Sequence, residues 1–256
     1  MRLLADLHTH TVASGHAFST VTELATAAAG KGLELIAFTD HGPSVPGGAH
    51  FWYFWNAKVV PPRIEGVRVL RGCEANVADS ENGLDLPDEV LAGLEVVAVG
   101  FHPLTGFDEI DRERNTRALL RAMANPLVDV VTHPGNAAEF PLDADRIVEA
   151  AVEHGVALEL NNHSFDPRSG RSGGQATERA FAIAARDAGA WISLGSDAHY
   201  HDQVGDLDNA LAVVEEIGFP HARIVNRDER SVLEFLNGRR ARAGRGPVDG
   251  YPEVIL

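Results

Sequence analysis

The sequence is poor in cysteine and lysine and has no long apolar run. Its one cysteine, Cys73, can form neither an internal disulfide nor a thiolate cage for a metal. No stretch approaches the ~18 uninterrupted apolar residues of a membrane-spanning helix, and the N-terminus lacks the apolar core of a secretory signal. We therefore expect a cytoplasmic protein with no membrane partner, in which any metal binds through nitrogen and oxygen.

Positive charge is also scarce. The 256 residues include 37 acidic and 22 basic side chains, which gives a formal net charge of −15. Such a field repels nucleic acids at long range, so we expect a small-molecule substrate or ligand and no long nucleic acid. The hydrophobic fraction of 45% is sufficient for one substantial core.

The sequence contains a repeated alternation of short and long apolar patterns. Near-continuous runs of Val, Ile, Leu and Ala are typical of strands buried on both faces, and they lie at residues 3–7, 35–38, 67–70, 96–101, 128–132, 156–160 and 191–194. Spacing typical of helices occurs at residues 20–31, 110–124, 144–154, 175–188 and 207–217. A last strand and helix are expected at 222–226 and 229–236.

This order predicts an α/β protein with a parallel sheet. Seven strands in a single domain favour a closed or nearly closed barrel, with an open doubly wound sheet as the alternative. We place the domain at residues 1–238. We expect a C-terminal tail at 239–256, of which residues 239–250 are rich in Arg and Gly and loosely held.

Side chains that can bind metals follow the predicted strands: His8, His10, His16, His41, Glu74, His102, His133, Asp197 and His199. The carboxyl ends of barrel strands meet at one rim, and polar groups buried there are costly unless they serve one another or a metal. His8 and His10 are two residues apart on a strand, so they point the same way and can chelate one ion; Asp197 and His199 repeat this spacing. Glu74 has two oxygens and can bridge two ions. Nine ligands suit about three ions.

Five segments together resemble the PHP (polymerase and histidinol phosphatase) superfamily: DLHTH at 6–10, TDHG at 39–42, GCEAN at 72–76, HPGN at 133–136 and GSDAH at 195–199. The resemblance runs from about residue 3 to residue 237 and is closest to the small bacterial YcdX-type phosphatases. It implies a distorted (β/α)7 TIM-like barrel of the PHP type. It also implies a metal-dependent phosphoesterase, in particular a phosphomonoesterase, with three divalent ions, Zn or Mn, or else Fe.

The resemblance further implies three ligand sets, carried over residue by residue. One ion would bind His8, His10, Glu74 and Asp197, a second would bind Glu74, His102 and His133, and a third would bind His16, His41 and His199. Clustered divalent ions lower the pKa of bound water, so a metal-bound hydroxide would attack phosphorus in line, with no protein nucleophile.

Two further groups of residues are candidates for other roles. In the loop after the sixth predicted strand, Arg168 or Arg171 can bind a phosphate in a bidentate manner, unless both are merely solvated, and His163 is another substrate-binding candidate. The aromatic run at 51–55 either packs its loop onto the barrel, forms a contact in a homo-oligomer, or lines the substrate pocket. Cys73 should point away from the site because it is adjacent to Glu74.

Other functions fit parts of the same pattern. A binuclear amidohydrolase-type hydrolase also begins with HxH, but it usually uses a carboxylated lysine at a strand end, and neither Lys31 nor Lys58 follows a predicted strand. A PHP-type nuclease or nucleotide phosphodiesterase would share the scaffold, and the acidic charge disfavours only long polymers. A metal store would not need open coordination positions at a barrel rim.

Overall fold

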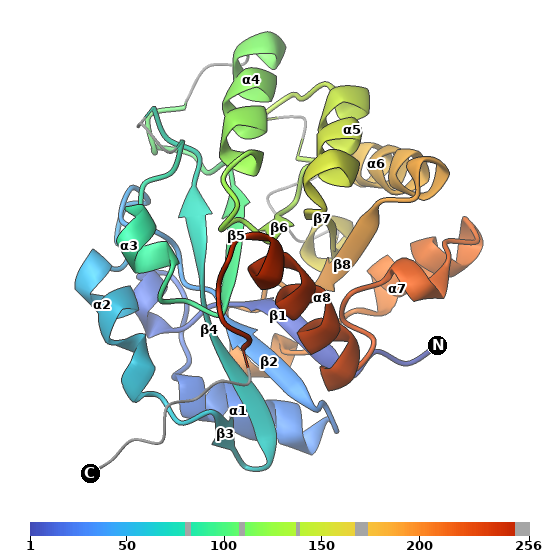
Figure 1. Cartoon of the computed structure of the whole chain (residues 1–256). Helices are drawn as coiled ribbons and strands as arrows, with labels where there is room; N and C mark the ends of the chain where they lie inside the picture. Colours follow the sequence, from blue (N-terminus) through green and yellow to red (C-terminus); the bar gives the residue numbers. More distant parts are fainter. Residues whose placement is uncertain (80–82, 108–110, 137–138, 167–173, 249–256) are drawn as a thin grey trace.

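Seven parallel strands form the centre of the protein in the computed structural model, which describes residues 1–79, 83–107, 111–136, 139–166 and 174–248 (Figure 1). Neighbouring strands pair in the order β1-β2-β4-β5-β6-β7-β8. Their bounds are β1 (Ala5–Thr9), β2 (Leu35–Phe38), β4 (Val67–Asn76), β5 (Val96–Gly100), β6 (Val130–Val131), β7 (Ala157–Asn161) and β8 (Trp191–Gly195), and the short β3 (Arg63–Ile64) is antiparallel to β4. All seven predicted strands are present, although β4 is longer and β6 shorter than predicted.

The sheet curves until its first and last strands nearly meet, which confirms the predicted distorted barrel. At the upper rim, which the carboxyl ends of the strands form, the N–H of His10 donates to the carbonyl of Ala198, at 2.8 Å. Lower down, the side-chain amide of Asn226 donates to the carbonyls of Ala5 and Leu194, each at 2.8 Å. Asn226 thus fills the gap between β1 and β8. The strand predicted at 222–226 is wrong: residues 221–223 form a 3-10 turn, so that only Ile224 is extended beside β8, where it makes an isolated bridge to Ile192.

Helices cover the outside of the barrel (Figure 1). They are α1 (Val21–Gly30), α2 (Phe51–Asn56), α3 (Asp88–Leu91), α4 (Arg112–Met123), α5 (Ala144–His154), α6 (Gln175–Ala188), α7 (Asp208–Glu216) and α8 (Glu229–Arg242), with short 3-10 turns η1 (Val12–Ser14), η2 (Ala57–Val59), η3 (Asn162–Phe165), η4 (His201–Gln203) and η5 (His221–Arg223). The predicted helices at 144–154 and 175–188 have the predicted bounds. Within the described ranges, no helix is long and apolar enough to span a bilayer.

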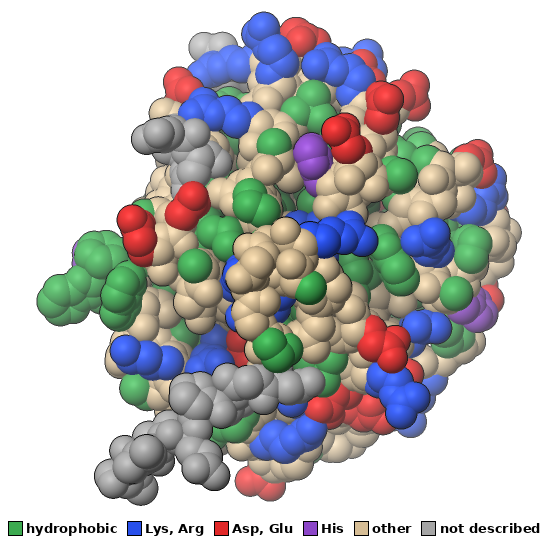
Figure 2. Space-filling view, viewed as in Figure 1, with side chains coloured by type: hydrophobic (Ala, Val, Ile, Leu, Met, Phe, Trp, Pro, Cys, Tyr) green, Lys and Arg blue, Asp and Glu red, His purple; other side chains and the backbone are tan. Residues whose placement is uncertain are grey.

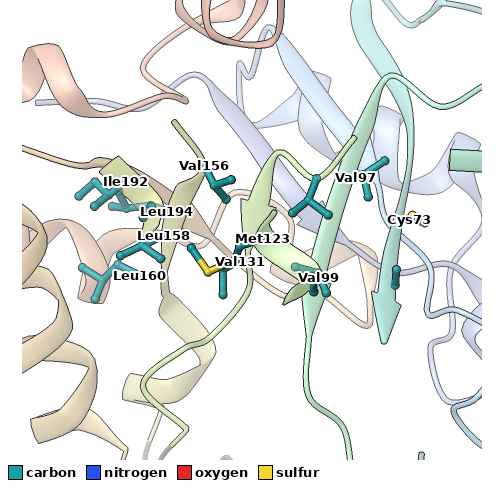
Figure 3. Close-up of a cluster of buried hydrophobic side chains, with 14 of the residues drawn as sticks. Cys73, Val97, Val99, Met123, Val131, Val156, Leu158, Leu160, Ile192 and Leu194 are labelled. Atoms are coloured by element: carbon teal, nitrogen blue, oxygen red, sulfur yellow. The ribbon is translucent and has the colours of Figure 1, made fainter. Parts of the chain in front are cut away.

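Alternation along the strands separates two apolar cores. The outer core lies between the sheet and the surrounding helices, and Figure 3 shows part of it, with Met123 of α4 among side chains of several strands. Cys73 belongs to this outer core and is fully buried, so it points away from the barrel interior as predicted. The inner core fills the lower barrel. This lower end of the barrel, where the strands begin, is closed by Val232, Phe235 and Leu236 of α8. In Figure 1 the helix α8 lies across this end, which is the end nearer to the viewer.

The expected loose tail is wrong for its first residues. The helix α8 continues to Arg242, and Arg239 is buried. Its guanidinium lies 3.0 Å from a carboxylate oxygen of Asp129 and donates to the carbonyl of His154 at 2.7 Å. An arginine with these partners can be buried at a helix end, and it fastens α8 to the bottom of the barrel.

The aromatic run forms the short helix α2, and its members have different environments. Phe54 is buried and Tyr53 is half-buried, whereas Trp52 and Trp55 are exposed. Figure 2 shows hydrophobic side chains protruding at the left edge, where α2 lies in Figure 1. Part of the run therefore packs its loop onto the barrel. The exposed part lines a groove with Val59 and Val60, separate from the cavity described below.

Candidate metal centre

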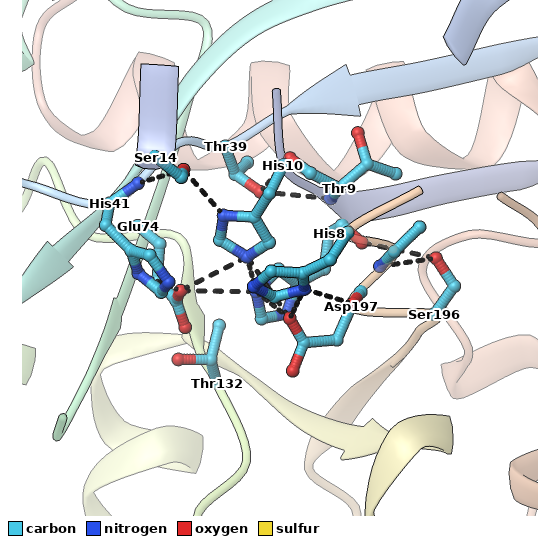
Figure 4. Close-up of polar contacts among 12 residues, drawn as sticks. His8, Thr9, His10, Ser14, Thr39, His41, Glu74, Thr132, Ser196 and Asp197 are labelled. Carbon is cyan, nitrogen blue, oxygen red and sulfur yellow. Dashed lines mark hydrogen bonds and ion pairs between the residues drawn. The ribbon is translucent and has the colours of Figure 1, made fainter. Parts of the chain in front are cut away.

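An irregularity in β1 turns two consecutive side chains toward the interior. Ala5 and Leu7 belong to the inner core. Between Asp6 and Thr9 the register with β2 shifts by one residue, and such a bulge reverses the face that the following residues present. His8 therefore also points into the barrel although it follows Leu7 directly (Figure 4).

Glu74 contacts most of the histidines of the polar cluster that occupies the upper barrel, and Figure 4 shows its carboxylate directed toward the imidazoles of His8 and His10. Its Oε2 is 2.9 Å from Nδ1 of His41 and 3.3 Å from Nε2 of both His8 and His102. Its Oε1 is 2.9 Å from Nε2 of His133. Oε2 also lies 3.5 Å from Nε2 of His10. One carboxylate thus contacts five imidazoles from four different strand ends, the arrangement expected of a group that bridges cations.

The remaining predicted residues extend the cluster on one side. His10 Nε2 lies 3.1 Å from His8 Nε2 and 3.2 Å from Asp197 Oδ1. His199 contacts Asp197 through Nδ1, at 3.6 Å from Oδ1, and its Nε2 is 3.0 Å from Nε2 of His16. The structure therefore brings all nine predicted residues into one continuous cluster.

Several imidazoles are held by Nδ1 so that Nε2 faces the centre. Nδ1 of His8 lies 2.7 Å from Oε1 of Glu159, and Nδ1 of His102 lies 2.7 Å from Oδ1 of Asn76. Both partner atoms accept hydrogen bonds, so in each ring Nδ1 carries a proton and Nε2 is the nitrogen that is directed inward. Metal-binding histidines are usually oriented in this way.

Three groups of side chains present ligand atoms within 4.8 Å of one another: His8, His10 and Asp197; His41, Glu74 and His102; and His10, His41 and His199. In the part of the chain that the structure describes, Nδ1 of His41, Oε2 of Glu74 and Nε2 of His102 are buried and lie close together, but none of them has a partner in hydrogen-bond geometry. Buried polar atoms are costly when unpaired. A divalent cation bound among them would satisfy all three, so the residues present fit a metal.

The cluster perturbs the pKa values of its members. Burial alone would raise the pKa of the Glu74 carboxyl, but the nearby imidazoles of His102, His8 and His41 hold it well below its usual range. Burial and the proximity of His41 lower the pKa of His10 well below the ordinary value. Glu74 is therefore a carboxylate and His10 is neutral, which are the protonation states that bind metals.

Backbone strain is concentrated at the same rim. His133 has a φ of 32° and Asp197 a φ of 54°, in the left-handed region that residues with side chains rarely adopt. Strain of this kind persists where surrounding structure enforces it and is frequent at functional sites. Both strained residues here are members of the cluster.

A cavity of about 420 Å³ lies beside the cluster and is lined by His16, His41, Val45, Phe101, His102, Pro103, Asn136, Glu139, His163, Asp197, His199 and Gln203. His163 therefore faces the space in which a substrate of this centre would lie. The predicted phosphate contacts Arg168 and Arg171 lie outside the described residues.

Comparison with known proteins assigns this architecture to a family. The PHP domain profile matches residues 6–163, which is more than half of the chain. The chain belongs to the PHP domain family. The chain after residue 163, which lies beyond the matched segment, contains β8 and two further members of the cluster of this PHP protein, Asp197 and His199.

Relatives of this PHP chain are similar over nearly their whole length. A protein named as a probable phosphatase in Caldanaerobacter subterraneus subsp. tengcongensis is 44% identical over 246 residues, 96% of this chain and 96% of its own. One of the same description in Thermoanaerobacter sp. (strain X514) is 44% identical over 95% of this chain and 98% of its own. Among solved structures, histidinol phosphate phosphatase from Lactococcus lactis, complexed with Zn, L-histidinol and phosphate, has a TM-score of 0.63. It is 18% identical and covers 86% of this chain and 95% of its own. This likeness shows the PHP fold.

Sequence reasoning did not assign a role to Glu159, which supports His8 in this PHP domain. Its Oε2 accepts from the backbone N–H of His133 at 2.9 Å and from the side chain of Asn161 at 3.0 Å. One carboxylate thus orients two members of the cluster, His8 and His133. A detectable signal existed: Glu159 is a charged residue inside an apolar strand, β7, and such residues are rarely buried without a partner.

Proposed function

We propose that this protein is a phosphomonoesterase that uses three divalent ions, Zn or Mn, or else Fe. The phosphatase descriptions of its relatives support the reaction class, and a zinc-containing PHP fold neighbour supports the metal chemistry. The observation that carries the proposal is the central position of Glu74, since one buried carboxylate contacts His8, His41, His102 and His133.

Two of the three proposed ligand sets share Glu74. The first ion would be held by His8, His10, Glu74 and Asp197, the second by Glu74, His102 and His133, and the third by His16, His41 and His199. The structure also places His41 with Glu74 and His102, so His41 lies between the second and third sets. When bound, such ions lower the pKa of water and supply a hydroxide nucleophile near neutral pH.

The protein itself would orient the substrate and hold the ligands. Glu159 and Asn76 hold Nδ1 of His8 and His102, so that Nε2 of each ring faces the cluster. We propose that His163, at the cavity wall, contacts the substrate. Arg168 and Arg171 are proposed to bind the phosphate, because planar guanidinium groups match phosphate oxygens in a bidentate manner.

Lysine positions disfavour the amidohydrolase alternative. Nζ of Lys31 lies 2.7 Å from Oδ1 of Asp206, in an ion pair on the surface. Lys58 lies in η2, and its side chain does not line the cavity beside the cluster. Neither lysine can supply the carboxylated bridge that such enzymes usually use.

Metal stoichiometry combined with matched substrates tests the proposal. Elemental mass spectrometry of untagged, desalted protein, before and after reconstitution with Zn²⁺ or Mn²⁺, is expected to give about three ions per chain, as nine ligand groups suggest. The reconstituted protein should hydrolyse 4-nitrophenyl phosphate much faster than bis(4-nitrophenyl) phosphate. His221→Asn, which changes a surface histidine paired with Glu215, should leave both results unchanged.

Three outcomes would contradict the proposal in different ways. About two ions with activity on carboxylic esters or amides alone would indicate the amidohydrolase reaction. Preference for the diester would indicate a phosphodiesterase or nuclease. Tight metal binding without any hydrolysis would indicate a metal store.

A further inference from the structure

Ser14 is a buried residue at the end of η1, beside the candidate metal centre. It is four residues after His10 and two before His16, and its side chain is inaccessible to solvent. Figure 4 shows it joined to the imidazole of His10 and to the backbone of His41. It therefore connects the ends of β1 and β2.

The hydroxyl of Ser14 makes three polar contacts but has only one proton to donate. Its Oγ is 2.6 Å from Oδ1 of Asp40, 3.1 Å from Nδ1 of His10 and 3.2 Å from the backbone N of His41. The carboxylate can only accept and is the closest, so it takes the hydroxyl proton. Oγ must then accept from both His41 N–H and His10 Nδ1–H.

This polarity determines the tautomer of His10. With the proton on Nδ1, the lone pair of Nε2 is directed at the cluster, where Oδ1 of Asp197 lies 3.2 Å away. His10 belongs to two of the three groups that could hold a metal, and His41 also belongs to two. One hydroxyl thus holds the two histidines that the groups share.

Asp40 is held in turn by three further donors. Its Oδ1 accepts from the backbone N–H of Thr11 at 2.7 Å, and its Oδ2 accepts from the hydroxyls of Thr11 at 2.8 Å and Tyr53 at 2.6 Å. Burial and the adjacent Asp40 raise the pKa of the Tyr53 phenol, so it remains a donor. Tyr53 belongs to α2, so the network extends from the metal centre to the aromatic helix.

We propose that Ser14, held by Asp40 and Tyr53, is a positioning residue that fixes the tautomer of His10 and the place of His41 and thereby sets the affinity for divalent cations. This inference rests on the proposed metal-dependent function. It assigns to a hydroxyl and a distant tyrosine the supporting role that Glu159 performs directly for His8.

Zinc affinity of the metal-free protein is the primary test. Apo wild type and apo Ser14→Ala are titrated with Zn²⁺ against a chromophoric chelator. We expect at least one Zn²⁺ equivalent to bind about 10- to 100-fold more weakly in the variant, the usual effect of removing a group that orients a ligand. Nitrogen NMR of histidine-labelled apo protein should show one imidazole losing its Nδ1–H tautomer.

Ser19→Ala is the matched control. Ser19 is equally buried in the same region, and its hydroxyl lies 3.2 Å from Nδ1 of His201, which is outside the cluster. Its removal should leave zinc affinity and the tautomers of the cluster unchanged. A merely structural role for Ser14 would make the two alanine variants alike in zinc affinity, and that result would overturn the inference.

A second variant covers the case in which Ser14→Ala does not fold. Tyr53→Phe removes only a hydroxyl and leaves Asp40 with three donors, so it should fold and bind zinc more weakly than wild type, by less than Ser14→Ala. Wild-type zinc affinity in Tyr53→Phe would then refute the inference. A wild type that binds no zinc or manganese would refute the proposed function instead.

Discussion

At the residue scale, the centre depends most on Glu74. Replacing it by Gln keeps the volume but removes the charge that five imidazoles surround. We expect Glu74→Gln to fold, to lose at least one ion per chain and to lower kcat/KM on the order of 100-fold or more, because removing even a supporting group costs about 10- to 100-fold. Metal analysis and phosphatase kinetics measure both. Glu149→Gln, on the exposed face of α5, serves as the control, and full metal content in Glu74→Gln would show that Glu74 is no ligand.

Residue identity alone predicted the members of the cluster but not its supports. Histidines and acids at strand ends are visible in a sequence because strand ends are predictable. The role of Glu159 depends on contacts with His8 and His133 that the closed barrel creates. Gly195 illustrates the same limit: a Cβ there would lie 1.9 Å from Oε1 of Glu159, so only glycine leaves room for this carboxylate, and nothing local in the sequence indicates it.

At the scale of elements, α8 supports the barrel from below, and its first turn has a strong cap. Both the backbone N–H and the hydroxyl of Ser231 donate to Oδ1 of Asp228, each at 2.7 Å. These bonds lower the pKa of Asp228. A lowered folded pKa contributes stability that is present above the unfolded value of ~3.9 and is lost as pH falls through the folded value.

We therefore expect Asp228→Ala to lower the free energy of unfolding by about 1 kcal/mol at pH 7. The difference from wild type should shrink as pH falls below ~4, because protonation weakens the cap in wild type alone. Urea unfolding of both proteins at several pH values measures this. Asp228→Asn keeps an amide oxygen as acceptor and should remain near wild type at pH 7. A loss in Asp228→Ala that stays constant down to pH 3 would contradict an ionised cap.

Elements with strong periodicity were predictable and irregular connections were not. The helices α5 and α6 have the predicted bounds because their apolar spacing and following glycines are local signals. The connection from β2 to β4 contains only the six-residue α2 as an α-helix. Contacts that no periodic pattern indicates hold this helix, such as the hydrogen bond from Tyr53 to Asp40. Arg239 was misjudged for a related reason: its partner Asp129 is distant in sequence.

At the scale of the whole molecule, barrel closure and metal binding are coupled. Closure by Asn226 and by the hydrogen bonds of Ala198 brings β8 beside β1, which joins Asp197 to His8 and His10. Alternating strands and helices predicted the parallel sheet, but they did not distinguish a barrel from an open sheet. The side chain that fills the gap between β1 and β8 comes from a segment without regular secondary structure.

Because ligands from β1 and β8 would share an ion, metal should stabilise the closed barrel. An ion that binds only the folded state at about 1,000 times its Kd adds about 4 kcal/mol, and in a chain of this size each kcal/mol shifts Tm by about 2–4 °C. Chelation should therefore lower Tm by about 10 °C or more, and readdition of Zn²⁺ or Mn²⁺ should restore it. Mg²⁺ should restore less, because imidazole-rich ligand sets favour transition metals. Calorimetry of protein verified as metal-free decides the point: an unchanged Tm would mean that the nine side chains hold the barrel together through their own contacts and that ions add nothing to its closure.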